Sequence, residues 1–204
     1  MSITTTRQLE PLARRSPSAF ALAGVLIIAS LVVPVGLDAL TDRSWAAGLV
    51  LMGLAIGAVS VGLLGLYPRV SARAPGVALG GVVAATVAGV AALGVIALVG
   101  VALVGEVVLG TSVPEPMGVF AVLGLSMAGG FSLGLLLFGI ASWRSERPSR
   151  AVGGLLFGGG TVLLVPVVVE LVGPAYGIET PAWLLFAVIG VVALDSLAIG
   201  YSLR

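Results

Sequence analysis

Asp195 is the residue whose type and position point most directly to chemistry. It lies about thirteen residues into the last apolar run of the chain, in the stretch VVALDSLAIG. An aspartate at the centre of a membrane helix costs about 2.5–3.5 kcal/mol on insertion scales, and such residues normally face the interior of a helix bundle. No basic residue lies in any apolar run to pair with it. Burial then favours the neutral acid, and a proton relay or a cation site is one interpretation of Asp195.

A structural interpretation of Asp195 stays open beside the functional one. A protonated acid can join two membrane helices through hydrogen bonds. The hydroxyl partners that the apolar runs offer are Ser30, Ser60, Ser132, Thr161 and Ser196. The sequence alone favours neither a relay nor such a link between helices.

Three other acids each end an apolar run, and two of them follow a proline. Asp38 closes LVVPVGLD, Glu106 closes VALVGE and Glu170 closes LLVPVVVE. We predict helix kinks at the two prolines, Pro34 and Pro166, because proline leaves the carbonyl four residues earlier without its donor.

Each proline shares a helical stripe with the acid that follows it. A free carbonyl, a kink and a carboxylate on one stripe predict a substrate or ion site that includes Asp38 and Glu170 beside Asp195. Glu106, which ends a run at the matching place without a proline, is a further candidate for this site. The alternative is that acids at helix ends simply reach headgroups and water, and that a proline one turn earlier ends the helix.

The residue types that are missing exclude most enzyme chemistry. The chain has no cysteine and no histidine, which removes thiolate nucleophiles, Ser-His pairs, histidine-ligated haem and the usual zinc sites. We therefore expect no enzymatic activity, no cofactor and no metal. The formal net charge is only +1, and the arginines do not form a separate basic domain. We therefore expect no nucleic-acid partner.

The composition of the chain indicates whether these residues lie in water or in lipid. Of 204 residues, 59% are hydrophobic and 9% are charged, against about 25% charged in soluble domains. Runs of about 20 apolar residues cross a bilayer, and six of them predict an all-α, polytopic integral membrane protein. The expected helices are 19–38, 46–66, 76–105, 118–141, 151–171 and 182–202. They form one transmembrane domain, 19–204, after a tail of residues 1–18.

Arginine positions predict the orientation of this domain. Nine of the ten arginines fall in the N-terminal tail, in the loops after the second and fourth helices, and at the C-terminus. These places lie on one side of the membrane, and only Arg43 falls on the other side. Basic residues near helix ends stay in the cytoplasm, so both termini should be cytoplasmic. All ten basic residues are arginine, which suggests a GC-rich prokaryote and its cell membrane. A signal peptide at the N-terminus is the alternative for the first run.

The six runs read as three hairpins with partly matching registers. Asp38 and Glu106 are 68 residues apart, and Glu106 and Glu170 are 64 apart, which suggests a threefold internal repeat; repetitive Val, Leu, Ala and Gly also produce such matches by chance. Small-residue pairs that allow close helix crossing occur at Gly53–Gly57, Gly76–Gly80, Gly130–Gly134 and Gly154–Gly158. Most should pack inside the bundle, and one could be a dimer face.

Two function classes remain after these exclusions. The first is a small transporter or channel-like protein in which Asp195, with Glu170, Asp38 and Glu106, handles a proton or a cation. The second is a non-catalytic membrane subunit or scaffold, packed through glycines against a larger complex or a second copy of itself. The lipid bilayer is the partner common to both.

Overall fold

Six long helices make up the computed structural model of the chain. The structure describes residues 3–38, 44–108, 110, 117–145, 150–172 and 181–204, and these residues contain no strand. In chain order the helices are α1 (Ile3–Asp38), α2 (Ser44–Val70), α3 (Pro75–Val108), α4 (Met117–Trp143), α5 (Arg150–Val172) and α6 (Ala182–Ser202). Each predicted apolar run lies within one helix, so the predicted all-α, six-helix architecture is confirmed.

The N-terminal tail differs from its prediction, because α1 is helical from Ile3 onward. The later part of this polar segment, around Ala13 and Ser16, packs on the last turns of α2. The Ser16 hydroxyl donates to the carbonyl of Gly62 at 2.8 Å, and Arg69 Nη2 donates to the carbonyl of Ala13 at 3.2 Å. The polarity of the segment marks it as a tail in the sequence, but polarity does not prevent a helix that has a neighbour to pack on.

All six helices are long and apolar enough to cross a membrane, with spans of 20 to 34 residues. Large apolar side chains also point outward along the bundle. Leu93, Val122 and Leu194 are 66%, 64% and 66% exposed. A surface of this kind would associate in water, whereas lipid chains solvate it. The chain is therefore a multi-pass membrane protein.

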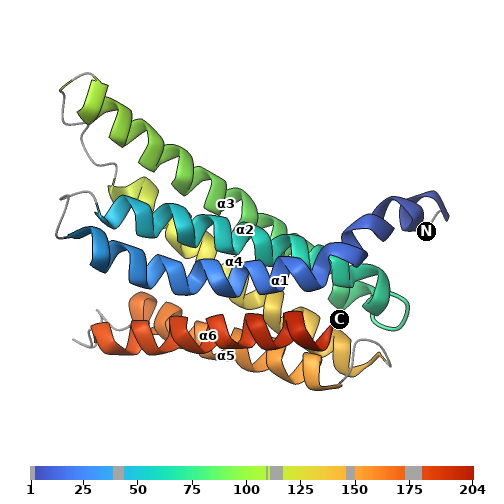
Figure 1. Ribbon diagram of the computed structural model, residues 1–204. Coiled ribbons are helices and arrows are strands. Elements are labelled where there is room, and N and C mark those ends of the chain that lie inside the picture. Colours follow the sequence, from blue (N-terminus) through green and yellow to red (C-terminus); the bar gives the residue numbers. More distant parts are fainter. Residues whose placement is uncertain (1–2, 39–43, 109, 111–116, 146–149, 173–180) are drawn as a thin grey trace.

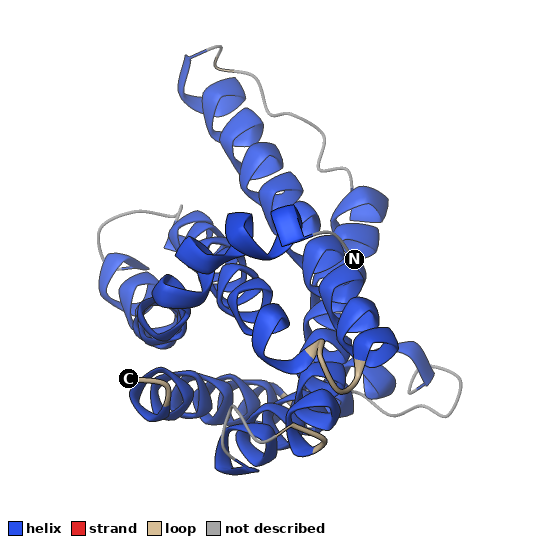
Figure 2. Cartoon of the chain, turned by 90° about the vertical axis from the view of Figure 1, so that its right-hand side faces the viewer, coloured by secondary structure: helices blue, strands red, loops and turns tan. Residues whose placement is uncertain are grey.

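The helices pack in sequence order, and α6 closes the bundle against α1. Helix α2 also contacts α4 across the middle. Both termini lie at the same end of the bundle (Figure 1), and Figure 2 looks onto that end. Arg69, Arg144 and Arg150 lie at the helix ends on this side, so the arginine-rich end and the termini coincide.

The three hairpins pack unequally. Helices α1 and α2 lie together along their length, α5 and α6 share a looser seam, and the C-terminal part of α3 diverges from the other helices (Figure 1). Helix α3 is a single helix of 34 residues, about 51 Å at 1.5 Å per residue, as its long apolar run predicts. This arrangement gives no support to the threefold repeat, which stays a prediction.

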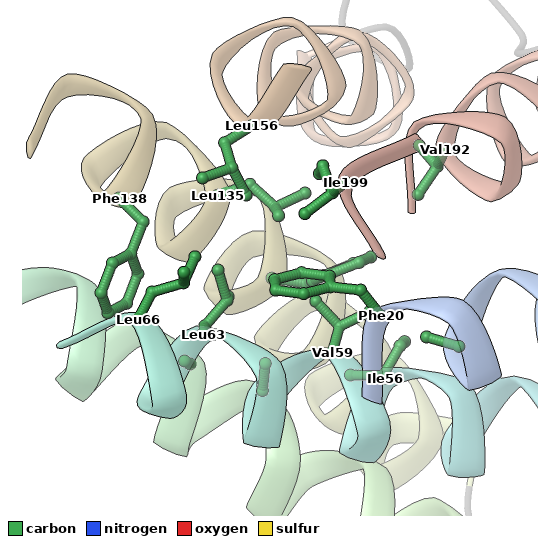
Figure 3. Close-up of a cluster of buried hydrophobic side chains, with 14 of the residues drawn as sticks. Phe20, Ile56, Val59, Leu63, Leu66, Leu135, Phe138, Leu156, Val192 and Ile199 are labelled. Carbon is green, nitrogen blue, oxygen red and sulfur yellow. The ribbon is translucent and has the colours of Figure 1, made fainter. Parts of the chain in front are cut away.

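A core of aromatic and branched side chains fills the half of the bundle nearer the termini. Phe20 of α1, Leu63 of α2, Phe138 of α4 and Leu156 of α5 are fully buried and point toward one another (Figure 3). Ile199 brings α6 to the same cluster. Helix α3 adds buried alanines such as Ala85 and Ala88, so all six helices contribute to this core.

Glycines allow the helix backbones to approach closely. A Cβ added to Gly139 would lie 2.7 Å from the backbone nitrogen of Phe157, and one added to Gly200 would lie 2.9 Å from the carbonyl of Pro17. Gly130 of α4 lies similarly close to the carbonyl of Ala84. Such contacts replace the hydrophobic effect, which does not drive helix association inside lipid.

The predicted pair Gly154–Gly158 is not used for packing within the chain. A Cβ at either glycine would meet no atom of the described residues within 4 Å, whereas Gly153 and Gly160 face α4. The α4–α5 crossing therefore uses a stripe next to the predicted one. Gly57 and Gly76 also face open space, while their partners Gly53 and Gly80 have close neighbours.

The crossing at Gly139 gives a direct test of this packing. We expect Gly139→Ala to lower the free energy of unfolding by about 1–3 kcal/mol, because backbone atoms of α5 occupy the space of the new methyl group. The matched control, Gly154→Ala, should leave stability unchanged. Thermal unfolding in detergent micelles measures both, and equal melting temperatures would contradict the proposed contact.

Candidate functional site

Asp195 lies on the seam between α5 and α6. A Cβ at Gly159 of α5 would be only 3.0 Å from Oδ2 of Asp195, so the carboxyl group occupies the place that a side chain at position 159 would need. The side chain is half-buried, whereas the adjacent Ser196 is buried against the bundle. Glycine at position 159 is therefore what allows the acid to sit between the two helices.

The hydroxyls that the sequence offers as partners do not reach Asp195. The hydroxyls of Ser30, Ser132 and Thr161 donate to carbonyls of their own helices at 2.7, 2.8 and 2.8 Å. The Ser60 hydroxyl is buried beside Gly89, between α2 and α3, and has no described partner. Within the described part of the chain, Asp195 thus lacks the donors that an interhelical hydrogen bond would require.

A partly open cavity of about 290 Å³ lies between five helices, in the half of the bundle away from the termini. Its walls are Ile27 of α1, Met52 of α2, Phe131 of α4, Leu163 of α5 and Val188 of α6, with apolar neighbours from the same helices. Every side chain that lines it is apolar. Helix α3 contributes nothing to this wall.

Asp195 lies one turn below this cavity. Val192 of α6 lines the cavity, and Asp195 follows it by three residues on the same side of the helix. On α5, Leu163 lines the cavity and Gly159, the neighbour of Asp195, lies four residues earlier. Asp195 is not itself a lining residue; its carboxyl group lies about one helical turn beyond the apolar wall, between α5 and α6.

The structure separates the other predicted site residues from this chamber or leaves them untested. Glu106 is exposed on α3, the helix that does not line the cavity. Asp38 and Glu170 lie in the last turns of α1 and α5, but their side chains fall outside the described part. The described geometry therefore does not bring these acids together with Asp195.

The two prolines have different surroundings. Pro34 and the carbonyl of Ser30 pack toward Gly48 of α2, where a Cβ would lie 2.9 Å from the proline ring and 3.3 Å from that oxygen. Pro166 is buried and lines the cavity. Both prolines lie inside continuous helices, so neither ends its helix, and only Pro166 belongs to the chamber.

The cavity itself is the feature that sequence reasoning does not find. Its lining residues are ordinary apolar residues of membrane helices, and nothing in their spacing distinguishes them from residues that face lipid. Among the described residues, no group of three potential ligands could hold a metal ion. The described lining of the chamber is therefore apolar throughout, and Asp195 is the ionisable group one turn beyond it on α6.

A second hollow, of about 490 Å³, lies between α2 and α3. Gly53, Gly57 and Gly89 form its floor, and Ser60 and Thr86 are its polar lining residues. The Thr86 hydroxyl donates to the carbonyl of Val82 at 2.8 Å. No described residue that lines this groove is charged. The groove therefore has no group that could form an ion pair with a ligand, as Asp195 could.

Comparison with known proteins adds no functional assignment. No protein-family model matches the chain, and no similarity was found to curated proteins or to solved structures. Function must be argued from the site itself.

The unpartnered carboxyl group predicts an unusual response to substitution. We expect Asp195→Ala to leave the free energy of unfolding unchanged or raise it, because it removes a polar group that has no described donor. Ser16→Ala, the control, should lower stability by about 1 kcal/mol, because it removes the hydrogen bond to Gly62. Denaturant titration in micelles measures both, and a large loss of stability in Asp195→Ala would instead favour the structural link.

Proposed function

We propose that this protein is a small transporter in which Asp195 handles a proton or a cation. The observation that carries the proposal is the position of the carboxyl group, one turn below an apolar chamber and beside Gly159. Ionisable residues inside membrane bundles are costly and are typical of ion and proton pathways. Because the described residues provide Asp195 with no donor, its proton and its charge are available to a ligand.

A carrier fits the chamber better than a channel. A channel for hydrated ions needs a polar or water-filled path, whereas the walls near Met52, Phe131 and Val188 are apolar. An inorganic ion would lose its hydration there without compensation. The geometry therefore supports binding and release at one site, with Asp195 as the group whose charge changes.

The proposed location is the cell membrane of a prokaryote, with both termini in the cytoplasm. The bias of arginine toward the end that carries the termini supports this orientation. The exclusive use of arginine among the basic residues supports the prokaryotic source. In this orientation the chamber lies in the outer half of the membrane and Asp195 in the inner half.

Flux measurements in proteoliposomes test the transport proposal. A pH-sensitive dye inside the vesicles reports proton movement when a gradient of Na⁺, K⁺ or an organic cation is applied. We expect at least one gradient to move protons in the wild type, and we expect Asp195→Asn to reduce that rate at least tenfold because it cannot exchange a proton. Asp195→Glu, which keeps an acid, should retain part of the rate.

Two outcomes would contradict this proposal. One is equal proton movement by the wild type and Asp195→Asn. The other is a wild-type rate no higher than that of protein-free vesicles under every gradient. Elution profiles from size-exclusion chromatography show whether each variant is folded before its flux is compared.

A second candidate function is a non-catalytic subunit of a membrane complex, and the free glycine stripe of α5 favours it. Gly154 and Gly158 face open space, and small residues four apart let another membrane helix approach closely. A second copy of this chain or a partner helix could occupy this stripe. The chamber would then be only a packing defect.

Gly158→Leu separates the two candidates. The new side chain meets no atom of the same chain near its Cβ, so the fold should be retained. If the protein is a subunit, this variant should lose its partner or its dimer in chemical crosslinking while Asp195→Asn keeps it. Under the transport proposal, Gly158→Leu keeps the flux that Asp195→Asn loses.

A further inference from the structure

We propose that the substrate of this chamber is an organic cation with a bulky apolar body. The apolar part would occupy the cavity, and the positive charge would lie at Asp195. This inference rests on the proposed transport function and narrows it to one class of ligand. Two properties of the chamber, its wall and its single carboxyl group, lead to it.

The wall selects an apolar body. A volume of about 290 Å³ lies at the lower end of the range for small-molecule sites, about 300–1,000 Å³. Phe131, Met52 and Pro166 offer aromatic, flexible and rigid apolar contacts. Methionine side chains adapt to ligands of irregular shape, so this wall suits apolar molecules without demanding one outline.

The carboxyl group selects positive charge. Asp195 lies one turn beyond Val192, which lines the chamber, and its Oδ2 packs against Gly159 of α5. A small metal ion requires six or more oxygen ligands when it is Ca²⁺, or a retained water shell when it is Mg²⁺. The described residues near Asp195 offer one carboxyl group and apolar side chains, which an organic cation can satisfy with a single ion pair.

Among the described residues, no other titratable group lies beside Asp195 at this level of the bundle. On α5, the nearest ionisable residues are Arg150 and Glu170, nine and eleven residues from Gly159 in the sequence. On α1, Gly24 packs against Leu197 and the carbonyl of Ala193. Arg15 precedes Gly24 by nine residues, or two and a half turns.

The remaining elements near Asp195 also lack a competing charge. Along α6 the next titratable residue is Tyr201, six residues away. Helix α4 has no ionisable residue between its start at Met117 and its end at Trp143. Asp195 is therefore the group that a ligand in this chamber would protonate, deprotonate or pair with.

Binding should then exchange one cation for one proton. In the empty chamber the apolar surroundings favour the neutral acid. When the cation arrives, the O–H bond of Asp195 breaks, the proton leaves to water, and the carboxylate pairs with the bound charge. The total charge in the chamber is zero before and after the exchange, which avoids burying a net charge.

Calorimetry with a matched pair of probes tests this inference. Methyltriphenylphosphonium carries the charge, and triphenylphosphine oxide is a neutral molecule of similar shape. The full-length protein is placed in nanodiscs and titrated at pH 6 and pH 8, in buffers with different ionisation enthalpies. Nanodiscs with Asp195→Asn protein provide the baseline for partition of each probe into lipid.

We expect saturable binding of the phosphonium, stronger at pH 8 than at pH 6, with release of about one proton. Asp195→Asn should bind it at least tenfold more weakly, and Asp195→Glu should restore part of the affinity. The neutral oxide should bind the wild type and Asp195→Asn equally. Equal binding of the phosphonium by those two proteins, or no proton release, would overturn the inference.

Two aromatic substitutions test whether the probe occupies the cavity. Ala128 lines the chamber on α4, so Ala128→Phe should abolish binding of the phosphonium. Val122, on the exposed side of the same helix, is the control, and Val122→Phe should bind normally. If Ala128→Phe is folded and binds like the wild type, the site is elsewhere and the inference fails.

The result also separates this inference from the transport proposal. If the phosphonium does not bind saturably but proton flux driven by Na⁺ or K⁺ still depends on Asp195, the substrate class is wrong and transport stands. If neither binding nor flux depends on Asp195, both proposals fail.

Discussion

Close approach of helix backbones is the constraint on which the rest of this structure depends. Inside lipid, burying an apolar side chain between helices gains little over leaving it in lipid, so association depends on packing contacts. Glycines at positions such as Gly65, Gly139 and Gly200 provide those contacts, because each faces backbone atoms of a neighbouring helix. The core around Phe20 and Phe138, to which all six helices contribute, can form only because these crossings bring the helices within reach.

The chamber occurs where this close packing ends. Toward the termini, all six helices contribute to one buried core (Figure 3). At the other end of that core, α1, α2, α4, α5 and α6 leave a cavity of about 290 Å³, whose wall includes the core residue Phe131 and the buried Pro166. Asp195 lies at the junction of the packed and the open regions. The carboxyl group thus occupies the one level at which an apolar ligand and the packed end of the bundle would meet.

Hydropathy is sufficient to predict six helices and their order, because each needs only a run of apolar residues long enough to cross a bilayer. It does not predict residues 3–18 as helix, because this stretch is polar; its contacts with α2 at Ala13 and Ser16 are visible only in the structure. Nor does hydropathy predict which glycines face a neighbouring helix. Gly153 and Gly160 pack against α4, whereas Gly154 and Gly158 do not, and a rotation of α5 by one residue would reverse these roles. Asp195 is identifiable from sequence by its isolation, whereas the cavity depends on how five helices are placed.

The energetic position of Asp195 links the fold to its proposed role. Its insertion costs about 2.5–3.5 kcal/mol, a large fraction of the 5–15 kcal/mol by which folded proteins are typically stable. The described hydroxyls, such as those of Ser132 and Thr161, bond within their own helices and do not offset this cost. A ligand that binds only the folded protein stabilises it in proportion to its affinity and concentration. A cation held at Asp195 would therefore supply the interaction that the fold itself does not provide.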